Sequence, residues 1–303
     1  MLLANPRGFC AGVDRAIGAV EATLVRYGAP IYVRRPIVHN RVVTERLETV
    51  GAIFVQEVED VPDGSVLVMS AHGVATAVMA AARTKDLKVV DATCPLVTKV
   101  HTEVVAHYRA GRLVLLIGHP HHPEIIGTLG QVPTGAVILI SSLADVCRVD
   151  RSRETTIAYA VQTTFSVREA AEIIHAIKQR FEDVAGPRSG NICYATTNRQ
   201  AAIEAIASEA DYVIVVGDQQ SSNANRLVEV ALAAGCPKAA LANDVQDLDW
   251  CSIDAAATIG MTAAASTPSS CVEKICHALA AQGFSIQEQD GFRETVSFKI
   301  VEI

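Results

Sequence analysis

Residues 88–100, KVVDATCPLVTKV, place a lone cysteine, Cys94, between a β-branched run and a helical pattern. Cys10 in LLANPRGFCAGV and Cys193 in NICYATTNRQ occupy the same position, each in a different third of the chain. None of the three has a second cysteine nearby in a C-x-x-C arrangement. Because packing alone gives no reason for this matched position, we interpret these three cysteines as chemically active.

Three thiolates brought together would form a soft-metal site with one position open to a ligand. We favour a [4Fe–4S] cluster in which one iron lacks a protein ligand, because an open iron suits redox chemistry in a reducing cytosol. A zinc site with three thiolates and an activated water is the alternative, and it would make the protein a hydrolase. The other five cysteines lack this context and are interpreted as core or surface residues: Cys147, Cys236, Cys251, Cys271 and Cys276.

Composition and charge limit the class of protein. Half of the 303 residues are hydrophobic and 5% are aromatic, which is typical of an α/β protein. The formal charge of −7 argues against a nucleic-acid partner but not against a local site for a small anion. The longest apolar runs, TGAVILI and YVIVVG, are too short to span a membrane. No signal or transit peptide is visible, so we expect a cytoplasmic protein whose cysteines are not a disulfide framework.

Short β-branched runs alternate with helical patterns, which predicts parallel sheets with covering helices. Four strands can be assigned to each third of the chain. They are LLA, PIYV, AIFV and VLVMS in the first, KVVD, LVLLIG, AVILI and TIAYA in the second, and NICY, YVIVV, KAALA and AATIG in the last. We therefore predict an α/β fold of three similar lobes, each a small, mostly parallel four-stranded sheet with flanking helices. The predicted limits are 1–84, 85–186 and 187–283, followed by a C-terminal tail over 284–303.

Each predicted lobe has two further strand-end loops that are rich in polar residues. Ligands of open α/β sheets bind beyond the carboxyl ends of the strands, so these residues are the candidates for a site. In the first lobe they are His39, Asn40 and His72; in the second, His119, His121, His122, Glu124, Gln162, Thr163 and Thr164; in the third, Ser221, Ser222, Asn223, Asn225, Thr262 and Ser266. If the three sheets point these ends at one centre, the cysteines share a cavity with them.

The residue types in these loops fit an anionic ligand and proton transfer. Histidine near neutral pH is a cation or a donor, which suits phosphate oxygens. Glu124 near a cluster and an anion would have a raised pKa and could donate a proton; the alternative is a helix-start glutamate that only interacts with the helix dipole. The run Ser221 to Asn223 offers hydroxyl, amide and backbone N–H donors, or simply caps a helix. No P-loop or G-x-G-x-x-G motif follows any predicted strand.

These residues resemble the family of 4-hydroxy-3-methylbut-2-enyl diphosphate reductase, also called LytB. The resemblance covers nearly the whole chain and rests on the segments ANPRGFCAGVDRAI, IVHN, SAHGV, DATCPLVTKVH, HPEIIGT, QTT, ICYATTNRQ and SSNANRL, in the family's order. It implies a three-lobed α/β fold around a central [4Fe–4S] cluster. The matching cluster ligands are Cys10, Cys94 and Cys193, and the fourth iron is left for the substrate's hydroxyl oxygen.

The resemblance also implies roles for the loop residues. Glu124 matches the proton-delivering glutamate, with His122 and Thr163 as its partners near the substrate alcohol. Thr163 also lines the implied substrate site. The positions that match the family's diphosphate pocket are His39, His72, His122, Ser221, Ser222, Asn223 and Ser266. The implied reaction is the two-electron, two-proton removal of the allylic hydroxyl, which yields isopentenyl and dimethylallyl diphosphates in the last step of the non-mevalonate isoprenoid pathway. The implied electron donor is a ferredoxin or flavodoxin.

The chain departs from the family's pattern at a few positions. Ala264 replaces a glycine, Ser269 replaces an acid, and Ile126 stands where the family has glutamate. The lost glycine predicts a change in how closely the backbone approaches the phosphate. Two alternatives therefore stand beside the reductase: a paralogue with a shifted substrate, and a non-catalytic iron–sulfur redox sensor, which would have no use for Glu124 or the phosphate-type loops.

Overall fold

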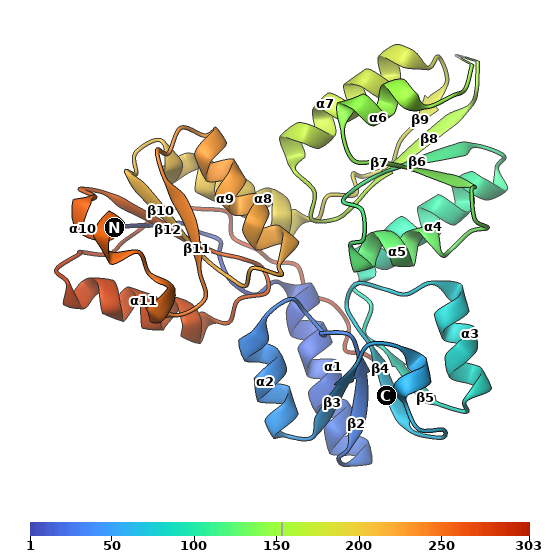
Figure 1. Cartoon of the computed structure of the whole chain (residues 1–303), viewed down its shortest axis with the longest axis horizontal. Coiled ribbons are helices and arrows are strands. Elements are labelled where there is room, and N and C mark those ends of the chain that lie inside the picture. Colours follow the sequence, from blue (N-terminus) through green and yellow to red (C-terminus); the bar gives the residue numbers. More distant parts are fainter. Residues whose placement is uncertain (153) are drawn as a thin grey trace. The chain divides into compact units, whose positions relative to one another are not determined.

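The structure is a computed structural model that describes residues 1–152 and 154–303 (Figure 1). The chain forms two compact units, each assembled from segments that are far apart in the sequence. Unit 1 comprises Met1–Asp14, His39–Glu45 and Tyr194–Ser297, and unit 2 comprises Arg15–Val38, Arg46–Cys193 and Phe298–Ile303.

Unit 2 holds two parallel sheets of four strands. The first contains β2 (Ile31–Arg34), β3 (Ala52–Val55), β4 (Val66–Met69) and β5 (Lys88–Asp91), in the order β3-β2-β4-β5. The second contains β6 (Leu113–Ile117), β7 (Val137–Ile140), β8 (Ile157–Val161) and β9 (Val184–Ala185), in the order β7-β6-β8-β9. The central strands read as continuous apolar runs because helices cover both faces of a parallel sheet.

Unit 1 holds one parallel sheet of five strands. These are β1 (Leu2–Leu3), β10 (Tyr212–Val216), β11 (Ala239–Ala242), β12 (Ile259–Ala263) and β13 (Gln287–Glu288), in the order β11-β10-β12-β1-β13. Side chains of a strand alternate between the two faces, and the core follows this rule. On β10, Val213 and Val215 pack on one face with Leu227, while Ile214 and Val216 pack on the other.

Helices link the successive parallel strands, because two parallel neighbours can only be joined by a crossover. They are α1 (Ala11–Tyr27), α2 (Arg41–Thr49), α3 (Thr76–Thr84), α4 (Pro95–Arg109), α5 (Pro123–Leu129), α6 (Leu143–Arg148), α7 (Val167–Arg180), α8 (Tyr194–Ala207), α9 (Ser222–Ala233), α10 (Trp250–Ala255) and α11 (Ser269–Ala281), with short 3₁₀ helices η1 (Val58–Asp60) and η2 (Val245–Asp247). Within residues 1–152 and 154–303, none of these helices combines the length and the apolar character that crossing a bilayer requires.

The predicted fold class is confirmed: three mostly parallel α/β sheets with flanking helices. The allocation of strands to sheets was partly wrong. The predicted strand LLA pairs with β12 in the third sheet, and KVVD closes the first sheet instead of opening the second. The segment NICY is a loop that leads into α8. The strands β9 and β13 were not predicted, and the third sheet has five strands instead of four.

The misallocation of KVVD has a physical cause. A strand's local pattern records that it is buried, but its partner is chosen by the crossover that precedes it. Residues 88–91 follow α3 and therefore return to β4, which lies in the sheet that the chain has just left. The three sheets agree in number with the predicted lobes, whereas the lobe limits stay a prediction.

The three sheets share one plan of loops. In each sheet there are two adjacent strands from which the chain continues to opposite sides of the sheet, and the gap between these two strands is a topological switch point. These pairs are β2 and β4, β6 and β8, and β10 and β12. The polar loops of the sequence follow the carboxyl ends of these strands, and the cysteine follows the next strand along: β5 precedes Cys94, β9 precedes Cys193, and β1 precedes Cys10.

Candidate active site

A buried carboxyl lies at the start of α5 in unit 2. Glu124 is 2% exposed, and both of its oxygens accept hydrogen bonds from Thr163, in the loop after β8. The Thr163 N–H donates to Oε1 at 2.7 Å, and the Thr163 hydroxyl donates to Oε2 at 2.7 Å. Since β6 and β8 are neighbours, the loops that follow them meet at one edge of the sheet. The switch point therefore brings together two residues that are 39 positions apart.

The burial of this carboxyl sets its acidity. Burial raises the pKa of Glu124 to about 7, although the two hydrogen bonds from Thr163 act in the opposite direction. A carboxyl with this pKa can hold and release a proton near neutral pH, as a general acid must. An interaction with the helix dipole alone would not account for the two bonds to Thr163.

Two histidines accompany the carboxyl in unit 2. His122 caps α5, and its Nδ1 accepts a hydrogen bond from the Glu124 N–H at 3.2 Å. A backbone N–H can only donate, so the neutral imidazole carries its proton on Nε2. The ring of His72 lies edge-on to that of His122, with centroids 5.9 Å apart. Both histidines are half-buried and come from switch-point loops, as the sequence predicted.

The loop that carries His72 and the helix that carries Glu124 touch through glycine. A Cβ atom added to Gly127 on α5 would lie 3.0 Å from the carbonyl oxygen of Gly73. A larger residue at Gly127 would push the two segments apart. This close approach holds α5 against the His72 loop.

Backbone hydrogen bonds attach two cysteines to these loops. The Cys94 N–H donates to the carbonyl of Ala71, next to His72, at 3.0 Å. The Cys193 N–H donates to the carbonyl of Thr163, also at 3.0 Å. Unit 2 thus connects the two cysteine loops to the histidines, the carboxyl and the threonine in one continuous arrangement.

Unit 1 holds the other group of predicted site residues. Ser221 caps α9, where its hydroxyl accepts from the Ala224 N–H at 3.3 Å. The Ser266 hydroxyl lies 3.4 Å from that of Ser221 and donates to the carbonyl of His39 at 3.2 Å. Burial lowers the pKa of His39, against the opposing charge of Asp218. The structure therefore brings together a helix N-terminus, two hydroxyls and the backbone of His39, and the N-terminus and hydroxyls are donors suited to an anion.

Asn223 is the polar group in unit 1 that most directly indicates a ligand. It lies in the first turn of α9 and is 5% exposed, and among the residues that the structure describes neither its Nδ2 nor its Oδ1 has a hydrogen-bond partner. Leaving a buried amide unsatisfied costs about 1–3 kcal/mol, so native proteins rarely retain one without a function. The fold therefore keeps this amide available for a ligand.

Cys10 lies at the start of α1 in unit 1. The N–H groups of Gly12 and Val13 bond its thiol, and Arg199 adds a positive charge nearby. Burial nevertheless raises the pKa of this thiol above its usual value. The N–H of Ala11, one residue further on, donates to the hydroxyl of Tyr194 at 3.1 Å. The residues that follow Cys10 and Cys193 are therefore bonded to each other.

The remaining predicted residues are placed as follows. Ser222 is the first residue of α9 and is half-buried. Asn225 instead bonds its own loop, through the carbonyls of Gln219 and Ser221 at 2.7 and 2.9 Å. Thr262 belongs to β12 and is fully buried, and its hydroxyl lacks a partner. Asn225 is therefore set apart from the candidate site.

The Ala264 methyl lies in the core of unit 1. Ala264 is fully buried in the core between β10, α8 and α9, and a Cβ on Gly217 would lie 3.2 Å from its methyl carbon. The side chain therefore points into the core, where Gly217 leaves room for it. The prediction of an altered backbone approach to phosphate gains no support from this position. Ser269 is exposed at the start of α11, and Ile126 is 42% exposed on α5.

Two further residues shape the site: Gln162, which was a candidate from the sequence, and Arg199, which was not singled out. Gln162 is fully buried; its Oε1 accepts from the His119 N–H at 2.9 Å, and its Nε2 donates to Thr164 at 2.8 Å. It thus ties together the loops that carry Glu124 and Thr163. Arg199, on α8, is fully buried and bonds the backbone just before Cys10. No local signal marked Arg199, because it stands in a polar segment, TTNRQ.

The chemistry of the three cysteines fits a metal cofactor that binds through sulfur. All three are half-buried thiols rather than disulfides, and each directly precedes a helix. Cys10 belongs to unit 1, whereas Cys94 and Cys193 belong to unit 2. In the part of the chain that the structure describes, no three His, Cys, Asp or Glu side chains are gathered into a ready metal site.

Fold and site together define a protein of three parallel α/β sheets whose switch-point loops present imidazoles and a buried carboxyl, with a thiol after the strand next to each switch point. A family model described as LytB protein matches residues 1–280. The chain belongs to this family.

Named relatives extend the match over nearly the whole chain. The 4-hydroxy-3-methylbut-2-enyl diphosphate reductase of Phenylobacterium zucineum is 48% identical over 301 residues, which is 99% of this chain and 96% of that protein. The enzyme of the same name from Gluconobacter oxydans is 48% identical over 99% of this chain and 91% of its own length.

Solved structures of the same enzyme share the fold. The E-1-hydroxy-2-methyl-but-2-enyl-4-diphosphate reductase from Plasmodium falciparum is 40% identical, with a TM-score of 0.96 over 99% of this chain and 95% of that one. A structure described as (E)-4-hydroxy-3-methyl-but-2-enyl diphosphate reductase, the terminal enzyme of the non-mevalonate pathway, is 30% identical, with a TM-score of 0.65 over 92% of this chain and 98% of that one.

Proposed function

We propose that this chain is a 4-hydroxy-3-methylbut-2-enyl diphosphate reductase. The reaction takes up two electrons and two protons, breaks the allylic C–O bond, releases water and leaves isopentenyl and dimethylallyl diphosphates. The observation that carries the proposal, beside the relatives, is the buried Glu124 bonded twice by Thr163, whose carbonyl holds the backbone of Cys193. A redox sensor would have no use for a buried proton donor beside a cysteine loop.

Members of the LytB family are iron–sulfur proteins. In this chain we assign a [4Fe–4S] cluster to Cys10, Cys94 and Cys193, which are soft ligands at three matched strand ends. When bound, the cluster supplies the electrons and an open Lewis-acidic position for the substrate oxygen.

The chain's own residues bind the diphosphate and fix its orientation. In unit 1, the N-terminus of α9 and the side chains of Asn223 and Ser266 offer donors, and the unpartnered Asn223 amide gains the hydrogen bond that it lacks. The resemblance to the family also assigns diphosphate-binding roles to His39, Ser221 and Ser222 in unit 1, and to His72 and His122 in unit 2. Holding the phosphates fixes the far end of the substrate, so that the hydroxyl has one orientation.

Glu124 delivers a proton to the departing oxygen. With a pKa of about 7, a large share of Glu124 is protonated at neutral pH. The Thr163 hydroxyl bonds Oε2, which fixes the carboxyl's rotamer and places a second polar group beside it. His122, whose Nδ1 accepts from the Glu124 N–H, presents Nε2–H as a donor.

The electron donor is proposed to be a ferredoxin or a flavodoxin, and the compartment the cytoplasm. The oxidised cluster is brown, whereas a protein with zinc at the three thiols is colourless. Colour and iron content therefore separate the cluster from the zinc alternative before any assay of activity.

Anaerobic turnover tests the proposal. Purified, cluster-loaded protein is mixed with a reduced viologen dye and 4-hydroxy-3-methylbut-2-enyl diphosphate, and dye oxidation is followed together with product analysis. We expect both five-carbon diphosphates. Isopentenyl diphosphate, which lacks the hydroxyl, is the matched control and should oxidise no dye. Brown, cluster-loaded protein that produces neither product would overturn the proposal in favour of a paralogue or a sensor.

A further inference from the structure

The C-terminal tail lies outside the family match, which ends at residue 280. It nevertheless accepts hydrogen bonds from two arginines that also bond the cysteine loops. After β13, the tail contributes residues to both compact units: its part up to Ser297 belongs to unit 1, and Phe298–Ile303 belongs to unit 2. In each unit, one arginine joins the tail to the backbone directly before a proposed cluster cysteine.

Arg199 makes this connection in unit 1. Its side chain is fully buried, and Nη2 donates to the carbonyls of Gly8 and Phe9 at 2.7 and 3.2 Å. Nη1 donates to Oε1 of Glu294 at 2.9 Å, and that same oxygen accepts from Asn198 Nδ2 at 3.1 Å. The Glu294 side chain is only 16% exposed. The guanidinium is therefore bonded on one side by the tail and on the other by the carbonyl that precedes Cys10.

Arg15 makes the same connection in unit 2. Its Nη1 donates to the carbonyl of Thr93 at 2.9 Å, and its Nε donates to the carbonyl of Lys299 in the tail at 2.9 Å. The Thr93 carbonyl belongs to the peptide group that leads into Cys94. Near the end of the tail, Val301 is buried. The tail thus meets both arginines at two separate points along its length.

We propose that residues 289–303 form a strap that positions two of the three cysteine loops, with Arg199 and Arg15 as the positioning residues. The inference rests on the proposed function, since it assigns those loops to a cluster. The peptide group is planar, so a hydrogen bond to the carbonyl oxygen of one residue also restrains the Cα atom of the next residue, which here is a cysteine. The forked guanidinium donates to two partners at once in a fixed geometry, so each arginine transmits the position of the tail to a cysteine.

Glu294 is the residue through which the strap is best tested. Without its carboxylate, the buried guanidinium of Arg199 loses the ion pair with Glu294, and its bonds to Gly8 and Phe9 weaken as it moves toward water. Outer partners of this kind typically change metal affinity about 10–100-fold when removed. The strap therefore acts on how firmly the cluster is held, in addition to any effect on the fold.

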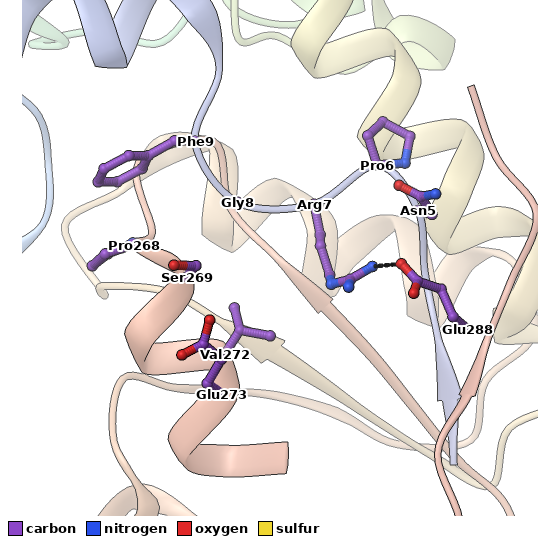
Figure 2. A pocket seen from close by; sticks show the side chains of 10 residues that line it. All are labelled: Asn5, Pro6, Arg7, Gly8, Phe9, Pro268, Ser269, Val272, Glu273 and Glu288. Atoms are coloured by element: carbon purple, nitrogen blue, oxygen red, sulfur yellow. Dashed lines mark hydrogen bonds and ion pairs between the residues drawn. The ribbon is translucent and has the colours of Figure 1, made fainter. Parts of the chain in front are cut away.

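A second tail glutamate provides a matched control. Glu288 pairs with Arg7 at 2.8 Å, and its side chain is 57% exposed. Both residues line a cavity of about 460 Å³. Figure 2 shows this pair among the residues that line the cavity. Glu288 and Glu294 are thus both tail carboxylates paired with an arginine, but only the second pair reaches the carbonyl before Cys10. An exposed pair contributes about 0–1 kcal/mol, so its loss should be silent.

The experiment measures iron release to a chelator from anaerobic, cluster-loaded protein, together with the electron paramagnetic resonance spectrum of the reduced state. We expect Glu294→Gln to release iron about 10-fold faster and to show an altered spectrum. Glu288→Gln should match the wild type in both measurements, and Glu294→Asp should recover part of the loss. A Glu294→Gln variant that is less heat-stable but retains wild-type iron release and spectrum would overturn the strap and leave a purely structural ion pair.

Arg15→Lys tests the contact between the tail and the Cys94 loop in unit 2. Its outcome does not depend on whether Glu294→Gln folds. A lysine cannot donate in the same fork to the Thr93 and Lys299 carbonyls, so faster iron release is expected, whereas Arg26→Lys at the exposed end of α1 should change nothing. Iron release equal to the wild type in both Glu294→Gln and Arg15→Lys would overturn the proposal. A wild-type protein that never acquires iron would instead contradict the proposed function, so the two failures are distinguishable.

Discussion

The loops after β6 and β8 and the loops after β10 and β12 occupy the same place in their sheets but differ in how their polar groups are satisfied. In the first pair, both oxygens of Glu124 are bonded by Thr163, and Gln162 ties the loops together. In the second pair, the buried amide of Asn223 has no partner. Equivalent switch points in two sheets thus serve different purposes. The loops after β6 and β8 hold a reactive group in place, and the loops after β10 and β12 keep donors available for a ligand.

This difference separates two kinds of mutation. Where a polar group is already satisfied within the chain, changing it should alter chemistry or stability. Where it is left unsatisfied, changing it should alter ligand binding and leave stability intact or improved.

The largest expected effect is on turnover in Glu124→Gln. The amide has the carboxyl's shape and can still bond Thr163, but it cannot donate the proton that the departing oxygen needs. We expect kcat to fall about 10²–10⁴-fold, with KM and iron content close to the wild type. Stopped-flow dye oxidation with parallel iron analysis measures both quantities. Turnover near the wild-type rate would remove Glu124 from the chemistry.

The next effect is the pH dependence that Glu124 confers on wild-type stability. Its folded-state pKa of about 7 lies above the usual 4.5, so the folded protein favours the protonated carboxyl. The protonated carboxyl therefore contributes about 3 kcal/mol to the unfolding free energy. This stabilisation is fully present below about pH 4.5 and is lost as the pH rises through about 7. Denaturant titrations of wild type and Glu124→Gln at several pH values measure it. The difference in unfolding free energy should shift against the wild type with rising pH, and a constant difference would contradict the buried carboxyl.

Paired variants at Asn223 and Thr163 test the comparison directly. Asn223→Ala should raise KM for the diphosphate about 10-fold and leave the unfolding free energy unchanged or higher, because it removes a buried group that has no partner. Thr163→Val should lower the unfolding free energy by about 1–3 kcal/mol, because it leaves a Glu124 oxygen unsatisfied. Steady-state kinetics and denaturant unfolding of both variants separate the two patterns. Equal stability losses would mean that both loops are merely structural.

The smallest expected effect concerns Ala264. Its methyl fills a core position against Gly217, so Ala264→Gly should lower the unfolding free energy by about 1 kcal/mol and leave KM unchanged. Ser269→Asp, in the first turn of α11, should instead stabilise by about 0.3–1 kcal/mol through the helix dipole. Thermal unfolding with a KM determination checks both. A large fall in KM on restoring the glycine would show that the methyl does reach the ligand.

The sequence predicted the class of fold and most of the candidate site for one reason. Residues such as His72, Glu124 and Ser221 were identified because a parallel strand's carboxyl end is a place where ligands bind, and strand ends are visible as the end of an apolar run. The partners of those strands were not visible. KVVD looks the same whether it opens one sheet or closes another, because pairing depends on the crossover and not on the strand's own residues.

Contacts between distant segments account for what the sequence could not predict. Arg199 lies in a helical pattern where an arginine would ordinarily be exposed, and its partner Glu294 follows 95 residues later in a tail with little regular structure. Likewise, nothing local to Asn223 distinguishes a capping residue from a buried amide without a partner. Burial is set by tertiary packing, so these roles appear only when the chain is folded.

The pairing of β1 has a consequence for how the protein is made. Residues 2 and 3 precede both other sheets in the sequence, yet their strand lies between β12 and β13, which follow those sheets. The segment that carries Cys10 therefore finds its place in a sheet only after β12 has been synthesised. A cofactor that needs this segment in its folded place is acquired after that point of synthesis.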